Sequence, residues 1–246
     1  MAIKKTNSAS RLLIVLNSAH KSDEKIRTEE AWAKAFGLAA DSPMRARAVS
    51  QRLLLLHDEL DRVKAGLAKS DVDPDVYKRA LVDVEAAIAP GALSTPWANH
   101  KSHLRPDVLV SLRYWSEFLP HEEEEVDAKD LADLLAEIEE LEQSLESSGL
   151  PEHLKALIKR QLEGIRTALT NYRIVGVRAL RDAAKAAVVE VVASQDELKA
   201  HKDTKEIGTF GRIIRRAGSI ADGAIKGQKA IEAVTKLYGY IEDFLK

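Results

Sequence analysis

The spacing of apolar residues most constrains the fold of this chain, because it follows the period of an α-helix almost throughout. Between Val49 and Leu67 the apolar side chains recur in alternating steps of four and three residues, which places one apolar seam along about five turns of helix. The same period returns in the segments 10–20, 24–36, 74–88, 107–119, 127–147, 151–174 and 177–193. The sequence therefore predicts an all-α fold, a bundle of about eight or nine helices joined by short connections.

Two stretches without helical periodicity divide the chain. Residues 90–106 contain three prolines and are expected to form a loop, and the polar residues 194–206 are expected to form a linker. We therefore predict an N-terminal helical region over 1–106 and a helical hairpin region over 107–193 that continues the same bundle. The last region, 194–246, is expected to hold the linker and a C-terminal amphipathic helical segment.

The hairpin is predicted from a short break between two helices of opposite charge. Gly149-Leu150-Pro151 separates two leucine seams, which is typical of antiparallel neighbours. Residues 121–152 carry thirteen acidic residues and one lysine, a net charge of −12, whereas residues 153–216 carry fourteen basic and seven acidic residues, a net charge of +7. Two hypotheses follow: the flanks of the hairpin attract each other, or the acidic face docks a basic partner.

The C-terminal segment is unusual because it combines a long apolar stripe with many glycines. Six of the twelve glycines fall in the last forty residues, and each costs about 1 kcal/mol in a helix relative to alanine. Close packing against another helix would offset that cost, and Gly223 and Gly227 form a small-residue face suited to it. We therefore predict a long Gly/Ala-rich amphipathic helix from about 207 to the C-terminus.

Three roles for this helix remain open at the level of sequence. It could pack on the chain's own bundle, dock onto a second copy or another protein, or lie on an anionic membrane surface. The membrane hypothesis rests on arginines beside apolar residues, the composition of an interfacial helix; the same arginines make a transmembrane position costly. The candidate interaction residues are Phe210, Arg212, Ile214, Arg215, Arg216, Gly223 and Gly227 in this helix, and Glu122, Glu123, Glu124 and Glu125 in the acidic run.

Candidate catalytic and metal-binding residues are few. The chain has no cysteine, which excludes disulfides, thiolate nucleophiles, cysteine zinc sites and iron–sulfur clusters. It also lacks the glycine-rich phosphate-binding motifs and the Gly-x-Ser-x-Gly elbow. His100 and His103 lie in the proline-containing loop, where we expect both to be exposed without a carboxylate to complete a zinc site. The sequence predicts no catalytic residue, no cofactor and no metal.

One spacing resembles a known enzyme family. Arg52 and His57 form an Arg-x4-His pair that resembles the motif of the HEPN ribonucleases, a helical-bundle family that acts on RNA phosphodiesters. The resemblance implies that His57 would act as the acid or base and Arg52 as the phosphate clamp. The position after the arginine is usually polar in that family but is Leu53 here, and the resemblance covers only these two residues.

Composition narrows the class of function. The net charge of −2 and the 5% aromatic content disfavour a nucleic-acid binder. The N-terminal apolar run, Leu12–Leu16, is shorter than the core of a signal peptide, so we expect a cytoplasmic protein. The sequence favours a non-enzymatic regulatory, adaptor or structural protein that binds another protein or a second copy of itself. A membrane-acting, toxin-like effector is the alternative, a ribonuclease the distant one, and a small-molecule ligand stays open.

Overall fold

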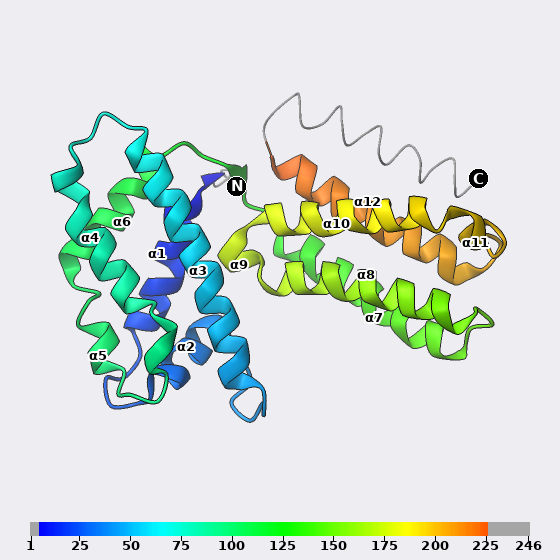
Figure 1. The fold of residues 1–246 in the computed structure, drawn as a ribbon, viewed down its shortest axis with the longest axis horizontal. Coiled ribbons are helices and arrows are strands. Elements are labelled where there is room, and N and C mark those ends of the chain that lie inside the picture. The colour runs from blue at the N-terminus through cyan, green and yellow to red at the C-terminus, as the bar shows by residue number, and fades with distance from the viewer. Residues whose placement is uncertain (1–4, 226–246) are drawn as a thin grey trace. The chain divides into compact units, whose positions relative to one another are not determined.

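The computed structural model describes residues 5–225 and confirms an all-α chain over this range (Figure 1). The α-helices are α1 (Ser8–His20), α2 (Thr28–Phe36), α3 (Arg45–Ala68), α4 (Pro74–Ala87), α5 (Ala98–Lys101), α6 (Pro106–Phe118), α7 (Ala128–Ser147), α8 (Glu152–Thr170), α9 (Tyr172–Val175), α10 (Val177–Ala193), α11 (Gln195–Lys199) and α12 (Lys205–Ala224). A 3-10 turn, η1 (Pro90–Ala92), and two short strands, β1 (Lys5–Thr6) and β2 (Glu123–Glu124), complete the described elements.

The helices differ widely in length. Over residues 5–225, nine helices have nine or more residues, whereas α5, α9 and α11 have only four or five. The helix predicted from about 207 begins at Lys205 as α12, and its described part ends at Ala224. The rest of that prediction, residues 226–246 with Gly227, lies outside the described residues.

The described helices form two compact units. The N-terminal unit contains residues 5–122 and 173–175, and the C-terminal unit contains residues 123–172 and 176–225. Apart from the short piece 173–175, the boundary between the units falls between Glu122 and Glu123, whereas the sequence predicts boundaries at 106/107 and 193/194. The boundary at 106/107 is predicted from the prolines of 90–106. Helix α6, which follows it, packs against α1 and α4 and so belongs to the N-terminal unit.

The core of the N-terminal unit is built on α3. The seam predicted along this helix is buried at every position: Val49, Leu53, Leu56, Leu60, Val63 and Leu67. Helices α1, α2 and α4 contact α3, and the rings of Trp32 and Trp97 meet edge to face with 5.3 Å between their centroids. Burial of these apolar surfaces, rather than the polar sequence of the loops, holds the helices of the N-terminal unit together.

The segment predicted as an exposed loop, 90–106, is partly a core element. It contains η1 and α5, and Trp97 and Leu104 are fully buried. His100 is 5% exposed, stacks on Trp97 and donates a 3.0 Å hydrogen bond from Nδ1 to the carbonyl oxygen of Ala87. The expectation that both histidines are exposed is wrong for His100, because the indole ring beside it provides an apolar site that composition alone does not reveal.

The C-terminal unit packs α7, α8, α10 and α12 around one apolar core (Figure 1). Leu134, Ile138 and Leu141 of α7 and Leu154 and Ile158 of α8 all belong to that core, as their helical spacing predicts. The segment predicted as a linker, 194–206, contains α11, and Leu198 within it is fully buried. Leu198 thus packs an otherwise polar connection against the core, and Glu197 beside it contacts His153 of α8.

Candidate functional site

The apolar face of α12 lies inside the C-terminal unit. Phe210 is 2% exposed and Ile214 is completely buried, because α12 packs on both α10 and α7. The other buried positions of this face are Ile207, Gly211, Ile213, Ala217, Gly218, Ala221 and Ala224. Two of the predicted interaction residues, Phe210 and Ile214, are therefore core residues in this structure.

The basic side of α12 meets the acidic side of α7. Arg216 forms a hydrogen bond with Glu137 and ion pairs with Asp133, at 3.5 Å, and Asp130, at 3.9 Å. Arg216, which the sequence analysis names as a candidate contact for a partner, is therefore paired with acidic residues of its own chain. Arg215 is half-buried and also has a partner, whereas Arg212 is exposed and donates a 3.0 Å hydrogen bond to the hydroxyl of Thr209.

The acidic run Glu122–Glu125 does not form one surface. The carboxylate of Glu123 is buried and accepts a 2.9 Å hydrogen bond at Oε2 from the backbone N–H of Val177. Val177 is the first residue of α10, so this carboxylate satisfies a free N–H at the positive end of that helix. Within this chain Glu123 thus caps a helix 54 residues away in sequence, and its contact with a partner stays a prediction.

Gly176 makes room for that carboxylate. Its backbone, with φ at 67° and ψ at −163°, lies in a region open almost only to glycine. A Cβ built there would fall 2.1 Å from Oε1 of Glu123. The glycine is therefore required both by the backbone and by the side chain that it accommodates.

Glu122 joins a buried charge network in the N-terminal unit. Arg11, 4% exposed, donates from Nε and Nη2 to Oε2 of the fully buried Glu59, at 2.9 and 2.7 Å. Nη2 also contacts Oε2 of Glu122 at 2.5 Å, and Ser8 donates to the same carboxylate from its backbone N–H and its hydroxyl. Burial opposes ionisation of Glu122, but the charge of Arg11 and these hydrogen bonds hold its pKa below the ordinary value.

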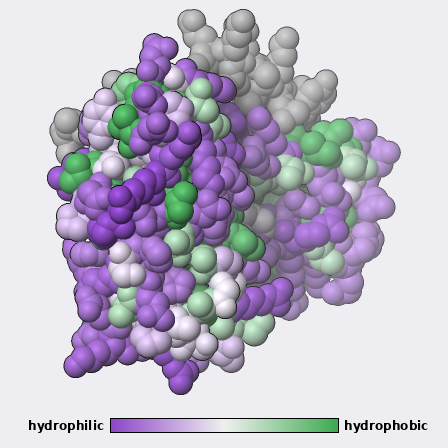
Figure 2. All heavy atoms as spheres, turned by 60° about the vertical axis from the view of Figure 1, so that its left-hand side comes forward, coloured by the Kyte–Doolittle hydropathy of each residue, from purple (hydrophilic) through white to green (hydrophobic). Residues whose placement is uncertain are grey.

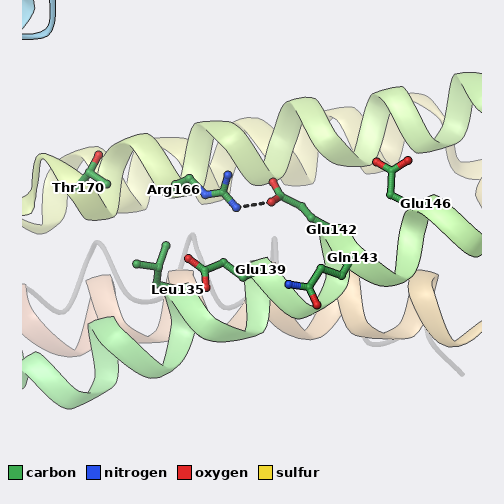
Figure 3. A pocket seen from close by; sticks show the side chains of 7 residues that line it. All are labelled: Leu135, Glu139, Glu142, Gln143, Glu146, Arg166 and Thr170. Carbon is green, nitrogen blue, oxygen red and sulfur yellow. Dashed lines mark hydrogen bonds and ion pairs between the residues drawn. The ribbon is translucent and has the colours of Figure 1, made fainter. Parts of the chain in front are cut away.

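The surface of the C-terminal unit is hollowed between α7 and α8. The groove has a volume of about 610 Å³ and is lined by Leu135, Glu139, Glu142, Gln143, Glu146, Arg166 and Thr170 (Figure 3). Arg166 hydrogen-bonds Glu142, and Lys159 donates to Glu146 at 2.5 Å. Residue numbers fall along α7 as they rise along α8 in these pairs, as in an antiparallel arrangement. The hydrogen bond from Lys159 lowers the pKa of Glu146.

Part of the acidic wall of this α7–α8 groove remains uncompensated. Glu139 lines the groove and is exposed, and the adjacent Glu140 is exposed as well. Neither carboxylate has an ion-pair partner within residues 5–225. In Figure 3 the side chains of Glu139 and Gln143 lie along the α7 edge of the groove, whereas Arg166 is turned to Glu142. The groove can therefore accept a cation from outside the unit.

A second hollow, of about 370 Å³, lies between the start of α7 and the end of α12. It brings together three predicted interaction residues, Glu124, Glu125 and Gly223, around the apolar Val126 and Ile220. A Cβ at Gly223 would meet no described atom within 4 Å, so no other helix of residues 5–225 approaches this glycine closely. The acidic rim is shaped by Asp127, which caps α7 with a hydrogen bond to the backbone N–H of Lys129.

The Arg52 and His57 pair lies on α3. A separation of five residues places them about 140° apart around the helix axis. Over residues 5–225 no hydrogen bond or ion pair joins them; Arg52 instead donates to the carbonyl oxygen of Ala48 at 3.5 Å. Burial lowers the pKa of Arg52. The ribonuclease hypothesis therefore gains no contact from the structure and stays a prediction.

Candidate metal sites and membrane-spanning helices are absent from the same residues. Within 5–225, no three histidine or carboxylate side chains are grouped so that they could hold a metal ion. No helix in that range is both long enough and apolar enough to cross a bilayer. Comparison with known protein families, curated proteins and solved structures gives no match. The function of this chain must therefore be inferred from its own residues.

Proposed function

We propose that this chain is a non-enzymatic interaction protein whose C-terminal unit binds a basic segment of another protein along the α7–α8 groove. The observation that carries the proposal is the exposed carboxylate of Glu139, which lines this groove without a cation from residues 5–225. The other acids of α7 that face neighbouring helices are paired with Arg166, Lys159 or Arg216. Glu139 and Glu140 thus remain for a partner.

The groove suits a polypeptide better than a small molecule. It is open to the surface rather than enclosed, whereas small-molecule pockets enclose most of the ligand surface. Leu135 and Thr170 offer apolar contact beside the acidic wall. A helix or extended segment with lysines or arginines beside an apolar residue would match both features.

The charges of the groove determine how such a partner would associate. Exposed ion pairs contribute about 0–1 kcal/mol each, so they add little affinity individually. They act over distance, however, and raise the rate of encounter and fix the orientation of the partner. Association should therefore weaken as ionic strength rises, because salt screens charges separated by more than about 10 Å at 0.1 M.

The proposal is tested with a designed amphipathic peptide that carries lysines beside leucines, and with the same peptide carrying glutamates instead. Fluorescence anisotropy should show salt-sensitive binding of the lysine peptide only. The variant Glu139→Lys/Glu140→Lys should bind it at least about tenfold more weakly. The control Asp58→Lys/Asp71→Lys makes the same change of net charge at exposed positions of the N-terminal unit and should leave binding intact. Equal loss in both variants would show non-specific attraction and overturn the proposal.

A further inference from the structure

Helix α6 of the N-terminal unit exposes an apolar stripe of three side chains at four-residue spacing. Val110 is 64% exposed, Tyr114 57% and Phe118 42%, while the opposite side of the helix supplies Leu112 and Trp115 to the core. Figure 2, which brings the side of the molecule carrying α6 forward, shows separate hydrophobic areas within a largely hydrophilic surface. An apolar stripe with this spacing is one face of a helix that has no partner within the unit.

The two aromatic rings of the stripe are preorganised, because they already stack on each other within one chain. Tyr114 and Phe118 stack with 5.7 Å between centroids and 12° between ring planes. They are the exposed aromatic residues of the described part of the chain. Rigid aromatic side chains are enriched in the central contacts of protein interfaces, since they bury much area at small cost in conformational entropy. The stripe thus has the composition of an interface centre.

Two charges of opposite sign flank the stripe on one side only. Arg113 and Glu117 are exposed and four residues apart, and each is without an ion-pair partner among residues 5–225. At about 100° per residue, both project to the same side of a line through Val110, Tyr114 and Phe118. The side of the stripe occupied by Ser111 carries no such pair.

We infer that α6 binds α6 of a second copy of this chain, antiparallel across a two-fold axis near Tyr114. In this arrangement Tyr114 faces its equivalent and Val110 faces Phe118 of the second copy. The charged sides meet, and Arg113 lies within about 3 Å along the axis of the level of the second copy's Glu117. Symmetry forms the pair twice. A parallel arrangement would place the charged side against the serine side and would form neither pair.

The size of the contact predicts a weak dimer. A 13-residue helix is about 20 Å long, so one pair of α6 helices buries less than the 1,200–2,000 Å² of a standard interface. We therefore expect a reversible monomer–dimer equilibrium that shifts with protein concentration. A permanent dimer is not expected from this surface alone.

Sedimentation equilibrium of the full chain over a range of concentrations tests the inference. The wild type should dimerise reversibly, and Tyr114→Ser should dimerise at least about tenfold more weakly, because it removes the central contact. Val189→Ser provides the matched control, since Val189 is 62% exposed on α10 of the other unit. Circular dichroism spectra of all variants establish that each is folded.

Charge exchange provides the sharper test. Arg113→Glu and Glu117→Arg should each weaken self-association about tenfold, because like charges then face each other twice. An equal mixture of the two single variants should recover dimers, since each chain then offers the charge that the other lacks. The double variant Arg113→Glu/Glu117→Arg should recover them also.

Four outcomes would overturn the inference. A full chain that stays monomeric at every concentration excludes it. A monomer in which Tyr114 is shielded from chemical labelling would show that another segment of the same chain covers the stripe. A dimer unaffected by Tyr114→Ser lies elsewhere on the molecule. Failure of the mixed single variants to recover dimers excludes the antiparallel arrangement. The groove of the C-terminal unit is untouched by these variants, so the result is independent of the proposed function.

Discussion

The carboxylate of Glu123 accepts a 2.9 Å hydrogen bond from the backbone N–H of Val177, at the start of α10. This bond ties the segment that precedes α7 to a helix 54 residues further along the chain, and both belong to the C-terminal unit. Gly176 lies directly before Val177 and allows the approach. This link depends on Glu123, which accepts the hydrogen bond, and on Gly176, which makes room for its carboxylate.

Gly176→Ala is expected to lower the free energy of unfolding by about 1–3 kcal/mol. Alanine disfavours the backbone conformation of this position, and its Cβ would overlap the carboxylate of Glu123. Thermal or urea denaturation followed by circular dichroism measures the loss. Gly164→Ala is the control, since Gly164 is an exposed position inside α8 with no atom near its Cβ; it should stabilise the chain by up to about 1 kcal/mol. Equal effects of the two substitutions would contradict this account.

Arg11→Met should destabilise the N-terminal unit by about 3–5 kcal/mol, because it removes the buried cation that hydrogen-bonds the fully buried Glu59. All three tryptophans lie in this unit, so their fluorescence reports its unfolding selectively. Arg62→Met also removes a cation near Glu59, at 3.7 Å, but from a half-exposed position, and should cost less than about 1 kcal/mol. The double variant Arg11→Met/Glu59→Leu should regain much of the loss. A double variant no more stable than Arg11→Met would argue against a charge penalty.

Stability of the same unit should depend on pH through Glu122. Its pKa in the folded chain lies below the ordinary value of 4.5, so its contribution is complete above about pH 4.5 and is lost as the pH falls through the folded-state pKa. Glu122→Gln should therefore be less stable than wild type at neutral pH, and the difference should shrink on acidification. Tryptophan-monitored urea unfolding at a series of pH values checks this. A difference that grows toward low pH would have the wrong sign.

Arg216→Glu should destabilise the C-terminal unit by about 1–3 kcal/mol, because it places a fourth carboxylate among Asp130, Asp133 and Glu137. Arg212→Glu is the matched change on the exposed side of α12 and should have little effect. Circular dichroism melts of both variants at low and high salt measure the difference. Salt should reduce the effect of Arg216→Glu, since screening weakens like-charge repulsion; destabilisation that is independent of salt would point to packing instead.

Hydrogen exchange tests whether α12 is available to a membrane. Its apolar face is buried, so the amides of 207–224 should exchange as slowly as those of α10. Vesicles containing an anionic lipid should bind the chain only under conditions in which exchange over 207–224 becomes fast. Binding of such vesicles while these amides stay protected would show that another surface contacts the bilayer.

The spacing of apolar residues along a helix predicts correctly which side chains of that helix are buried. The α3 seam from Val49 to Leu67 is buried at each predicted position, since a helix period fixes which side chains share a face. The inward positions of Glu123 and His100 could not be predicted in this way. Their partners, Val177 and Ala87, lie 54 and 13 residues away, and nothing in the sequence near either side chain marks them.

The charge pattern of the sequence predicts part of the site: it indicates ion pairs within the chain but not which acids stay unpaired. The opposite signs of 121–152 and 153–216 indicated attraction inside the chain, and the pairs Glu142–Arg166 and Glu137–Arg216 show such contacts. Which acids would stay unpaired depends on the rotation of α7 between α8 and α12. That rotation is set by the core, so Glu139 could not be singled out from its neighbours by sequence alone.

The burial of α12 also has a consequence for synthesis of the chain. The apolar side of α10 is complete once Ala193 has been added, but the helix that covers it ends only at Ala224. At about 5–20 residues per second, ribosomes need roughly 2–6 seconds to make the intervening stretch. During that interval the nascent C-terminal unit carries an uncovered apolar surface, while the residues of α1–α6 have already been made. A translational pause between these two helices would prolong the period in which the nascent chain is most prone to aggregate.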